Sequence, residues 1–393
     1  MNIALCTDSY LPTMGGTEYV VDILARKLVS DKFGKNRVAV FTQNFCRKND
    51  KDPIFPYEIY RTQSVKVPIL GEYVSYPKMD IKFTKDFVDF KPDIVHVHTL
   101  NEIGSWAVGL AKSLKVKSIL TIHTRYYYAF DIFVPFAEDS FLHKSIVDTF
   151  MKKLVDTAEN ADVLTTVSES SLKDELIDKY KINRKVHVIR NGFDLPEFKF
   201  DNNYYSKYND KDKFLISFAG RINKTKNLEF SLQVINELAK RKIPVEFYIA
   251  GVGVEKNNHM KFIEENDIRD NIKWLGRLKQ DALFKLHSKC DLFLIPSIFD
   301  TDSLAAMEAR CCGCPSMVIS NTGPAERIVE GENGFKVDYD LKKFVEKIEE
   351  LYKFKQSNYD EYLKIREKTR SIIPKSWDDI AGEYLELYKA NLK

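Results

Sequence analysis

The sequence contains no long hydrophobic run. None of its apolar stretches approaches the ~18 consecutive residues that a transmembrane helix requires. The first twelve residues, MNIALCTDSYLP, also lack the basic start and the long apolar centre of a secretory signal peptide. We therefore expect a cytoplasmic protein whose first β-strand begins almost at once.

The chain also lacks a strong excess of charge of either sign. Lys and Arg together number 60, Asp and Glu number 57, and the net charge is +3. Proteins that bind nucleic acids carry a pronounced basic excess, so we expect no nucleic-acid partner. The hydrophobic content of 44% and the charged content of 30% are typical of a globular protein.

Cysteine is scarce, and its spacing does not favour a metal site. The six cysteines are Cys6, Cys46, Cys290, Cys311, Cys312 and Cys314. Three of them form the cluster CCGC, but no second pair has the spacing of a zinc site. Buried free thiols are the simpler interpretation, and we expect no metal.

Short apolar runs alternate with helical patterns along most of the chain. Runs such as NIALC, RVAVFT and DIVHVHT resemble buried strands, and EYVVDILARKLV has apolar residues on one helical face. This alternation predicts parallel sheets covered by helices. The polar stretch DNNYYSKYNDKDK interrupts the pattern before it begins again. We therefore predict two doubly wound, Rossmann-like α/β domains over residues 1–196 and 197–375, followed by a helix over 376–393 that crosses back to the first domain.

In such sheets, ligands bind outside the carboxyl ends of the strands, so two facing domains would form a binding cleft. Arg221 and Lys226 follow the FAG strand, where they could bind phosphate or simply form a solvated basic loop. Asp300 and Asp302 precede a helix whose free N–H groups would attract anions, although such residues are often only N-caps. Glu308, further along that helix, could accept the hydroxyls of a ribose. Together these features indicate a site for a nucleotide diphosphate.

These residues resemble motifs of the retaining, nucleotide-sugar-dependent glycosyltransferases of the GT-B fold, family 4. The acidic pair of that family, E-x7-E, corresponds to Asp300 and Glu308, and its basic element corresponds to Gly220, Arg221, Ile222 and Lys226. The segments NGFD and EARCCGCP are also similar to family elements, and the resemblance covers nearly the whole chain. It implies that Arg221, Lys226 and the backbone N–H groups of Ser303 and Leu304 bind the donor diphosphate. Asp302 and Ser303 replace the aromatic residue and glycine often found there, and the sequence does not explain how the charge of Asp302 is accommodated.

The first domain carries the residues expected near the donor sugar. The resemblance implies that Gly15 and Gly16 allow the backbone to approach the donor, although a simple tight turn is the alternative. His123 corresponds to a family histidine near the donor sugar, so the expected catalytic residues are His123, Arg221, Lys226 and Asp300. His96 and His98 lie on one face of a strand, but no third metal ligand is evident. The resemblance implies neither a cofactor nor a bound metal.

The segment RYYYAFDIFVPF is rich in aromatic residues and precedes a helical pattern that contains three lysines. The aromatic residues form either core packing or an acceptor site; the candidate acceptor residues are Tyr126, Tyr127, Tyr128 and Phe130. A basic amphipathic helix beside them would suit an anionic membrane surface. This combination resembles bacterial glycosyltransferases that act on membrane lipids such as diacylglycerol. It implies reversible attachment to the inner face of the membrane.

The resulting hypothesis is transfer of a hexose from a UDP-sugar, with retention of configuration, to a membrane lipid or a cell-envelope glycan. A soluble glycan or a protein is the alternative acceptor. The fold also hosts nucleotide-sugar epimerases, sugar phosphorylases and non-catalytic binding subunits, so these alternatives stay open. A Rossmann oxidoreductase is disfavoured because no G-x-G-x-x-G follows the first strand.

Overall fold

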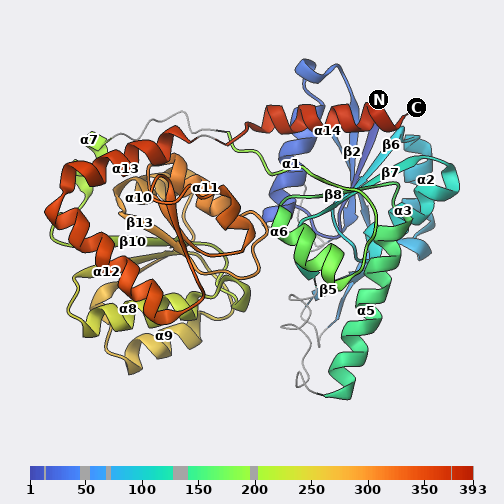
Figure 1. Cartoon of the computed structure of the whole chain (residues 1–393). Coiled ribbons are helices and arrows are strands. Elements are labelled where there is room, and N and C mark those ends of the chain that lie inside the picture. The colour runs from blue at the N-terminus through green and yellow to red at the C-terminus, as the bar shows by residue number, and fades with distance from the viewer. Residues whose placement is uncertain are drawn as a thin grey trace. The chain divides into compact units, whose positions relative to one another are not determined.

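The computed structural model of the chain describes residues 1–12, 15–44, 54–67, 72–126, 140–194, 202–372 and 374–392 (Figure 1). These residues form two compact units. The first unit comprises Met1–Gly192 together with Lys375–Lys393, and the second comprises Phe193–Pro374.

The first unit is built on a parallel sheet whose strand order is β3-β2-β1-β6-β7-β8-β9. The strands are β1 Asn2–Cys6, β2 Arg37–Gln43, β3 Glu58–Thr62, β6 Ile94–Val97, β7 Lys117–Ile122, β8 Val163–Thr166 and β9 Val186–Val188. The central strands are buried along nearly their whole length, as expected for parallel strands covered on both faces. This burial explains why they are continuous apolar runs in the sequence.

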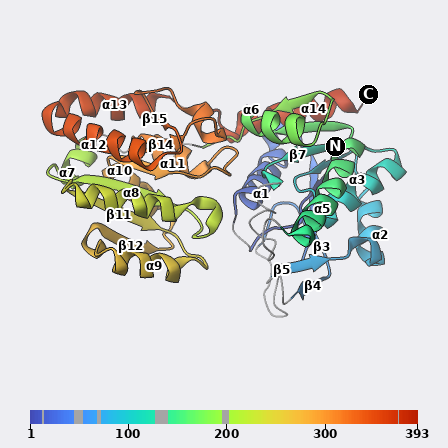
Figure 2. The ribbon, with the colours of Figure 1, turned by 60° about the horizontal axis from the view of Figure 1, so that its bottom comes forward.

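Helices surround this sheet and connect its strands. They are α1 Gly16–Leu28, α2 Ile81–Phe90, α3 Glu102–Leu114, α5 Phe141–Asn160, α6 Glu169–Ser171 and the π-helical segment η3 Leu172–Lys179, with short 3₁₀ turns η1 Asp31–Phe33 and η2 Pro77–Met79. Strands β4 Ser64–Val67 and β5 Glu72–Ser75 form a separate antiparallel hairpin. Figure 2 shows this hairpin at the opposite end of the unit from the C-terminal helix.

The C-terminal helix α14, Trp377–Asn391, packs on the first unit, and both ends of the chain therefore lie in that unit (Figure 1). Ser376 and Asp379 form a capping box at its start. A side chain at Gly192 would come within 2.8 Å of the backbone of Trp377, so only glycine permits this close approach. The local cap and the close backbone contact together fix where α14 begins.

The second unit contains a six-stranded parallel sheet in the order β12-β11-β10-β13-β14-β15. The strands are β10 Phe214–Ala219, β11 Val245–Ala250, β12 Ile272–Gly276, β13 Leu292–Ile295, β14 Ser316–Ile319 and β15 Gly334–Val337. Its helices are α7 Asn202–Tyr208, α8 Leu228–Lys240, α9 Lys256–Glu265, α10 Gln280–Lys289, α11 Leu304–Cys311, α12 Leu341–Ser357 and α13 Tyr359–Ser371, with 3₁₀ turns η4 Lys224–Lys226, η5 Arg269–Asn271 and η6 Gly323–Arg327.

The direction of this strand order reverses between β10 and β13. These strands are neighbours although β11 and β12 lie between them in the sequence. Such a reversal leaves a crevice at the carboxyl ends of the two strands, which is the usual ligand site of open α/β sheets. We therefore expect a binding site at the loops that follow β10 and β13.

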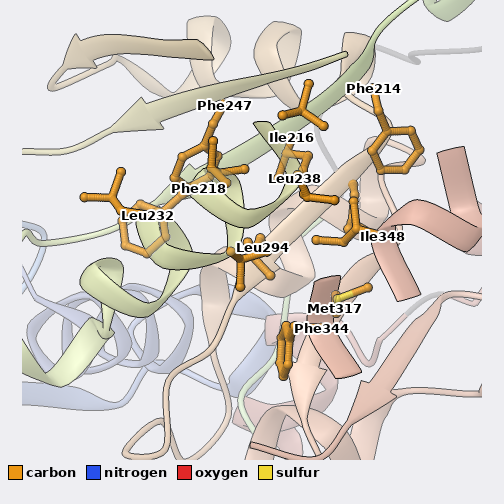
Figure 3. Close-up of a cluster of buried hydrophobic side chains, with 14 of the residues drawn as sticks. Phe214, Ile216, Phe218, Leu232, Leu238, Phe247, Leu294, Met317, Phe344 and Ile348 are labelled. Atoms are coloured by element: carbon orange, nitrogen blue, oxygen red, sulfur yellow. The ribbon is translucent and has the colours of Figure 1, made fainter. Parts of the chain in front are cut away.

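The core of the second unit forms where β10 meets α8 and α12. Figure 3 shows Phe214, Ile216 and Phe218 of β10 among apolar side chains of the two helices. Their period of two along the strand places all three on one face, as strand geometry requires. Leu238 of α8 and Phe344 of α12 are fully buried there. This packing holds β10 rigid, so the loop that follows it starts from a fixed point.

A buried ion pair joins α12 to Asp291, the residue immediately before β13. Lys355 and Asp291 are each 0% exposed, and Lys355 Nζ lies 3.1 Å from Asp291 Oδ2. The ammonium also donates to Asn209 Oδ1 at 2.8 Å and to the carbonyl of Lys213 at 2.7 Å. Asp291 in turn accepts from the backbone N–H of Leu215 at 2.7 Å. Both charges thus have the hydrogen bonds that a buried pair needs.

Candidate active site

The basic loop after β10 is held tightly against the loop after β11. A side chain at Gly251 would lie 2.0 Å from the carbonyl oxygen of Gly220, and Ile222 N–H donates to the carbonyl of Val252 at 3.0 Å. Ile222 itself is fully buried. The loop is therefore anchored by its apolar residue and its backbone, and its charged side chains need no role in holding it.

Arg221 and Lys226 differ in what they contact. The Arg221 side chain is exposed and makes no ion pair or hydrogen bond within the described ranges. Lys226 is partly buried, and its Nζ lies 2.6 Å from Asp300 Oδ1. Two residues predicted independently from the sequence are thus in direct contact, although 74 residues separate them.

The loop after β13 is fixed by the hydroxyl group of Ser297. This hydroxyl donates to the carbonyl of Thr225 at 2.9 Å and accepts from the N–H groups of Phe299 and Asp300 at 3.3 and 3.2 Å. Asp300 is held mostly out of solvent, and its Oδ2 has no hydrogen-bond partner in the described chain. One oxygen of Asp300 therefore balances the charge of Lys226, while the other is buried and unsatisfied among the described residues.

Helix α11 begins at this loop with a strained cap. Ser303 has φ +51°, a left-handed conformation that costs a residue with a Cβ about 1–2 kcal/mol. This conformation explains why glycine is common at the position in the family that the sequence resembles. Ser303 offsets part of the cost because its hydroxyl accepts from Ala306 N–H at 3.3 Å. The N–H groups of Ser303 and Leu304 donate to no other group in the part of the chain that the structure describes, so they are free to bind an anion.

Glu308 lies one turn further along α11 and is half-buried. Its side chain has no hydrogen bond or ion pair to any other described residue. Burial raises the pKa of its carboxyl group to about 7. A carboxylate held in this state is well suited to accept hydrogen bonds from a ligand, because nothing in the described protein satisfies its oxygens.

Glu308 should make nucleotide binding depend on pH. The affinity should rise between about pH 6 and about pH 8, because only the deprotonated carboxylate can accept both ribose hydroxyls. Replacing Glu308 with alanine should weaken binding of a nucleoside diphosphate by about 1–3 kcal/mol. Isothermal titration calorimetry at several pH values measures both effects.

Glu308→Gln is the matched control, because it keeps the size of the side chain and removes its titration. Whatever pH dependence remains in this variant belongs to the phosphates of the nucleotide. Unchanged affinity and an unchanged pH profile in both variants would remove Glu308 from the site.

The charge of Asp302, which the sequence left unexplained, is matched by an arginine of η6. Arg327 donates to both carboxylate oxygens of Asp302, through Nε and, at 2.8 Å, through Nη2. The Asp302 side chain is 1% exposed, so the carboxylate does not point into solvent. Sequence reasoning missed Arg327. The acidic residue Asp302 was the only signal in the sequence, because a buried carboxylate requires a cation. The cation lies 25 residues away, and no local sequence pattern identifies it.

His123, at the end of β7 in the first unit, is paired with a second histidine. His98 Nδ1 lies 3.0 Å from His123 Nε2, and the two rings are stacked with centroids 5.2 Å apart. Burial lowers the pKa of His123 to about 4 and holds that of His98 well below its usual range. Both rings are therefore neutral near pH 7, and one ring donates a hydrogen to the other.

His96 has a structural role. Its Nδ1 lies 2.6 Å from the hydroxyl of Tyr388 in α14, and its Nε2 lies 2.6 Å from Thr121 Oγ1. Both ring nitrogens are thus used within the fold. No group of three or more potential metal ligands occurs among the described residues.

Gly15 and Gly16 lie at the start of α1 in the first unit. Gly15 is the N-cap in an extended conformation, and a side chain at Gly16 would meet no atom within 4 Å. Packing in the described chain therefore does not demand glycine at position 16. An open N-terminus of this kind has room for a ligand close to the backbone.

Tyr126 is part of the apolar core of the first unit, and its hydroxyl accepts from Leu100 N–H at 3.2 Å. Tyr126 therefore contributes to core packing, which is the first of the two interpretations of the aromatic segment. We do not propose it as a residue that contacts the acceptor. Tyr127, Tyr128 and Phe130 lie outside the described residues. The structure therefore describes one of the four candidate acceptor residues.

Helix α5 carries the three lysines of the predicted basic helix. Lys144 and Lys152 are exposed, whereas Lys153 pairs with Glu102 of α3. The first residue of the helix, Phe141, is 87% exposed, and Leu142 beside it is also exposed. No helix among the described residues combines the length and the hydrophobicity needed to cross a membrane.

The cysteines of the CCGC cluster are thiols in the described chain. Burial raises the pKa of both Cys311 and Cys314 to about 12. The groups are therefore protonated thiols at neutral pH. Cys46 lies outside the described residues.

Solved structures that resemble this chain identify its fold. The cyanobacterial sucrose-phosphate synthase from Thermosynechococcus elongatus has a similar structure, with a TM-score of 0.76, 17% identity and coverage of 99% of this chain and 98% of that one. HepE from Anabaena, solved in complex with UDP, has a TM-score of 0.72, 17% identity and coverage of 99% and 100%. Two doubly wound parallel units with these neighbours define the GT-B fold, as the sequence predicted.

Two family models together match most of the chain. Residues 14–197 match the family described as Glycosyltransferase Family 4, and residues 201–371 match the one described as Glycosyl transferases group 1. The chain therefore belongs to the family 4 glycosyltransferases, and it is an enzyme of that class.

Two relatives of this chain have the same name. The alpha-monoglucosyldiacylglycerol synthase of Streptococcus pneumoniae is 25% identical over 82% of this chain and 71% of its own length. The protein of that name from Acholeplasma laidlawii is 24% identical over 90% and 87%. A GDP-mannose-dependent alpha-mannosyltransferase of Corynebacterium glutamicum is 24% identical over 86% and 77%. The names of these relatives thus refer to different sugars, glucose and mannose.

Proposed function

We propose that the chain is a retaining hexosyltransferase that transfers a sugar from a nucleotide diphosphate donor to a hydroxyl group of a membrane lipid or cell-envelope glycan. The observation that carries the proposal is the arrangement at the reversal of the second sheet. Two cations, two free backbone N–H groups and one unpartnered carboxylate are the groups that a nucleoside diphosphate requires.

In this reaction, the bond between the anomeric carbon and the diphosphate oxygen breaks, and the acceptor oxygen forms the new bond to that carbon. Negative charge accumulates on the leaving diphosphate, while the sugar becomes oxocarbenium-like. Arg221, Lys226 and the N–H groups of Ser303 and Leu304 stabilise the leaving group without rearranging, because the loops that carry them are already anchored.

His123 and Asp300 are proposed to contact the sugar. His123 is neutral and acts as a hydrogen-bond partner rather than as a cation, since burial depresses its pKa. The unsatisfied Oδ2 of Asp300 is an acceptor for a sugar hydroxyl. Gly15 and Gly16 leave the backbone at the start of α1 accessible to the donor.

The names of two relatives support a lipid acceptor such as diacylglycerol. The resemblance to the family favours UDP as the nucleotide, whereas the name of a third relative points to GDP-mannose as an alternative donor. The direct experiment incubates the protein with UDP-glucose or GDP-mannose and vesicles containing diacylglycerol, and follows the glycolipid by mass spectrometry. We expect glycolipid with one donor and retention of the anomeric configuration.

Other outcomes of this experiment would identify the alternatives. Conversion of the donor sugar without an acceptor would indicate an epimerase. Nucleotide binding without turnover on any acceptor would indicate a binding subunit. Transfer to a soluble glycan or protein, with none to lipid, would reject the lipid acceptor.

A lipid acceptor requires the protein to reach the membrane, and α5 offers exposed groups for this purpose. Each lysine near an anionic surface contributes about 1 kcal/mol of attraction, and Phe141 and Leu142 would add apolar burial. We expect the protein to float with anionic vesicles at low salt, to bind neutral vesicles less and to be released by salt.

The variant Phe141→Ser should weaken this flotation. The matched control is Val254→Ser in the second unit, a similarly exposed apolar residue that should have no effect. A protein that stays in the soluble fraction with both vesicle types at low salt would contradict membrane attachment.

A further inference from the structure

Asp302 and Arg327 form a buried ion pair beside the free N–H groups of α11. The guanidinium group binds both oxygens of the carboxylate, and the side chains are 11% exposed for Arg327 and 1% exposed for Asp302. Asp302 immediately precedes Ser303, whose N–H group is one of the proposed phosphate donors. A full negative charge therefore lies next to a site that must accept a strongly negative ligand.

The turn that carries Arg327 is pressed directly against the loop that carries Asp302. A side chain at Gly323, the first residue of η6, would lie 1.8 Å from the carbonyl oxygen of Thr301, so only glycine allows this contact. Arg310 of α11 holds the other end of η6, because its Nη1 donates to the carbonyl of Arg327 at 2.9 Å. The ion pair thus joins η6 to the loop after β13, and Arg310 in the last turn of α11 holds the backbone of η6 in place.

An unpaired carboxylate at position 302 would have two effects on a bound diphosphate. It would repel the phosphates, and it would compete for the N–H groups of Ser303 and Leu304, which attract any nearby anion. Arg327 prevents both effects, since it neutralises the charge and fixes both oxygens in a bidentate geometry directed away from solvent.

We propose that Arg327 is a positioning residue for the donor diphosphate, which it serves by neutralising Asp302 and holding the N-terminus of α11 open for phosphate. The inference rests on the proposed donor site and extends it to a residue outside the predicted set. Arg327 thus neutralises a carboxylate at a position where the family often has an uncharged aromatic residue.

A double-mutant cycle tests the proposal, with UDP and GDP as the probes and calorimetry as the measurement. Arg327→Met should weaken binding of the better nucleotide by at least about tenfold, because it removes the guanidinium group that binds both oxygens of the buried Asp302 carboxylate. Adding Asp302→Asn to this variant should restore affinity to within about threefold of the wild type. Asp302→Asn alone should bind the nucleotide no more weakly than the wild type, because it leaves an extra cation beside the phosphates.

Each result shows whether Arg327 acts by neutralising the charge of Asp302 or only by packing. A double variant as weak as Arg327→Met, or an Arg327→Met protein that binds like the wild type, would overturn the proposal. If Arg327→Met does not fold, the proposal is tested by Asp302→Asn alone and by the double variant. Weakened nucleotide binding in both of these variants would overturn the proposal. A wild type that binds neither UDP nor GDP would reject the donor site itself and this inference with it.

Discussion

Replacing Arg221 with alanine is expected to lower turnover about a hundredfold, which is the cost of removing one preorganised donor from a developing negative charge. The temperature of unfolding should stay unchanged, since the Arg221 side chain is exposed and has no partner among the described residues. Lys226→Ala should cause a similar loss of turnover. It should also lower stability slightly, because it leaves Asp300 without its cation.

Lys224→Ala is the matched control for both variants. Lys224 lies in the same loop, is exposed and carries the same charge, but it is not one of the predicted diphosphate ligands. Steady-state kinetics with a nucleotide-sugar donor should show near-normal turnover for this variant. Near-normal turnover in Arg221→Ala and Lys226→Ala as well would reject the diphosphate assignment.

Removing the cation of the buried pair in the second unit is expected to have the largest effect on stability. Lys355→Met leaves Asp291 charged and uncompensated in a site with no exposure to solvent, which should cost about 3–5 kcal/mol. It also leaves the carbonyl of Lys213 and Asn209 Oδ1 without their donor. Thermal unfolding monitored by calorimetry should show the second unit melting on the order of 10 °C lower.

Two comparisons isolate the buried charge as the cause. The double variant Asp291→Asn, Lys355→Met should be more stable than Lys355→Met alone, because no unpaired charge remains. Lys353→Met removes an exposed lysine that pairs with Glu349 on the same helix, and it should change stability by less than about 1 kcal/mol. Equal destabilisation by the single and the double variant would show that packing, and not charge, holds Lys355 in place.

Much of the fold was predictable because it depends on local patterns. The strands of both sheets are continuous apolar runs, since parallel strands are buried on both faces, and such runs are visible without any knowledge of the partners. Arg221, Lys226 and Ser303 stand where the sequence placed them, because each follows or opens an element at the end where ligands bind. Their role in binding a ligand, like that of Glu308 within α11, stays a prediction.

The pairings between these residues were not predictable. Lys226 contacts Asp300, Arg327 contacts Asp302 and His98 contacts His123 across 74, 25 and 25 residues of sequence. Sequence spacing carries no information about such contacts, because the strand order of the sheets, and not the order of the chain, brings them together. The same reason explains why the sequence did not place Tyr126, which lies in the core of the first unit.

The sequence by itself determined which elements form and which residue types stand at the carboxyl ends of the strands, because propensity, burial and capping act over a few residues. Only the tertiary structure decided which charged groups are paired within the protein and which can bind a ligand. No partner among the described residues contacts the side chains of Glu308 and Arg221 or the first N–H groups of α11. Distant side chains, in contrast, pair with Asp302 and Lys226. That distinction depends on distances of a few ångströms between loops that only the packed sheet brings together, since electrostatic balance is set by proximity in space.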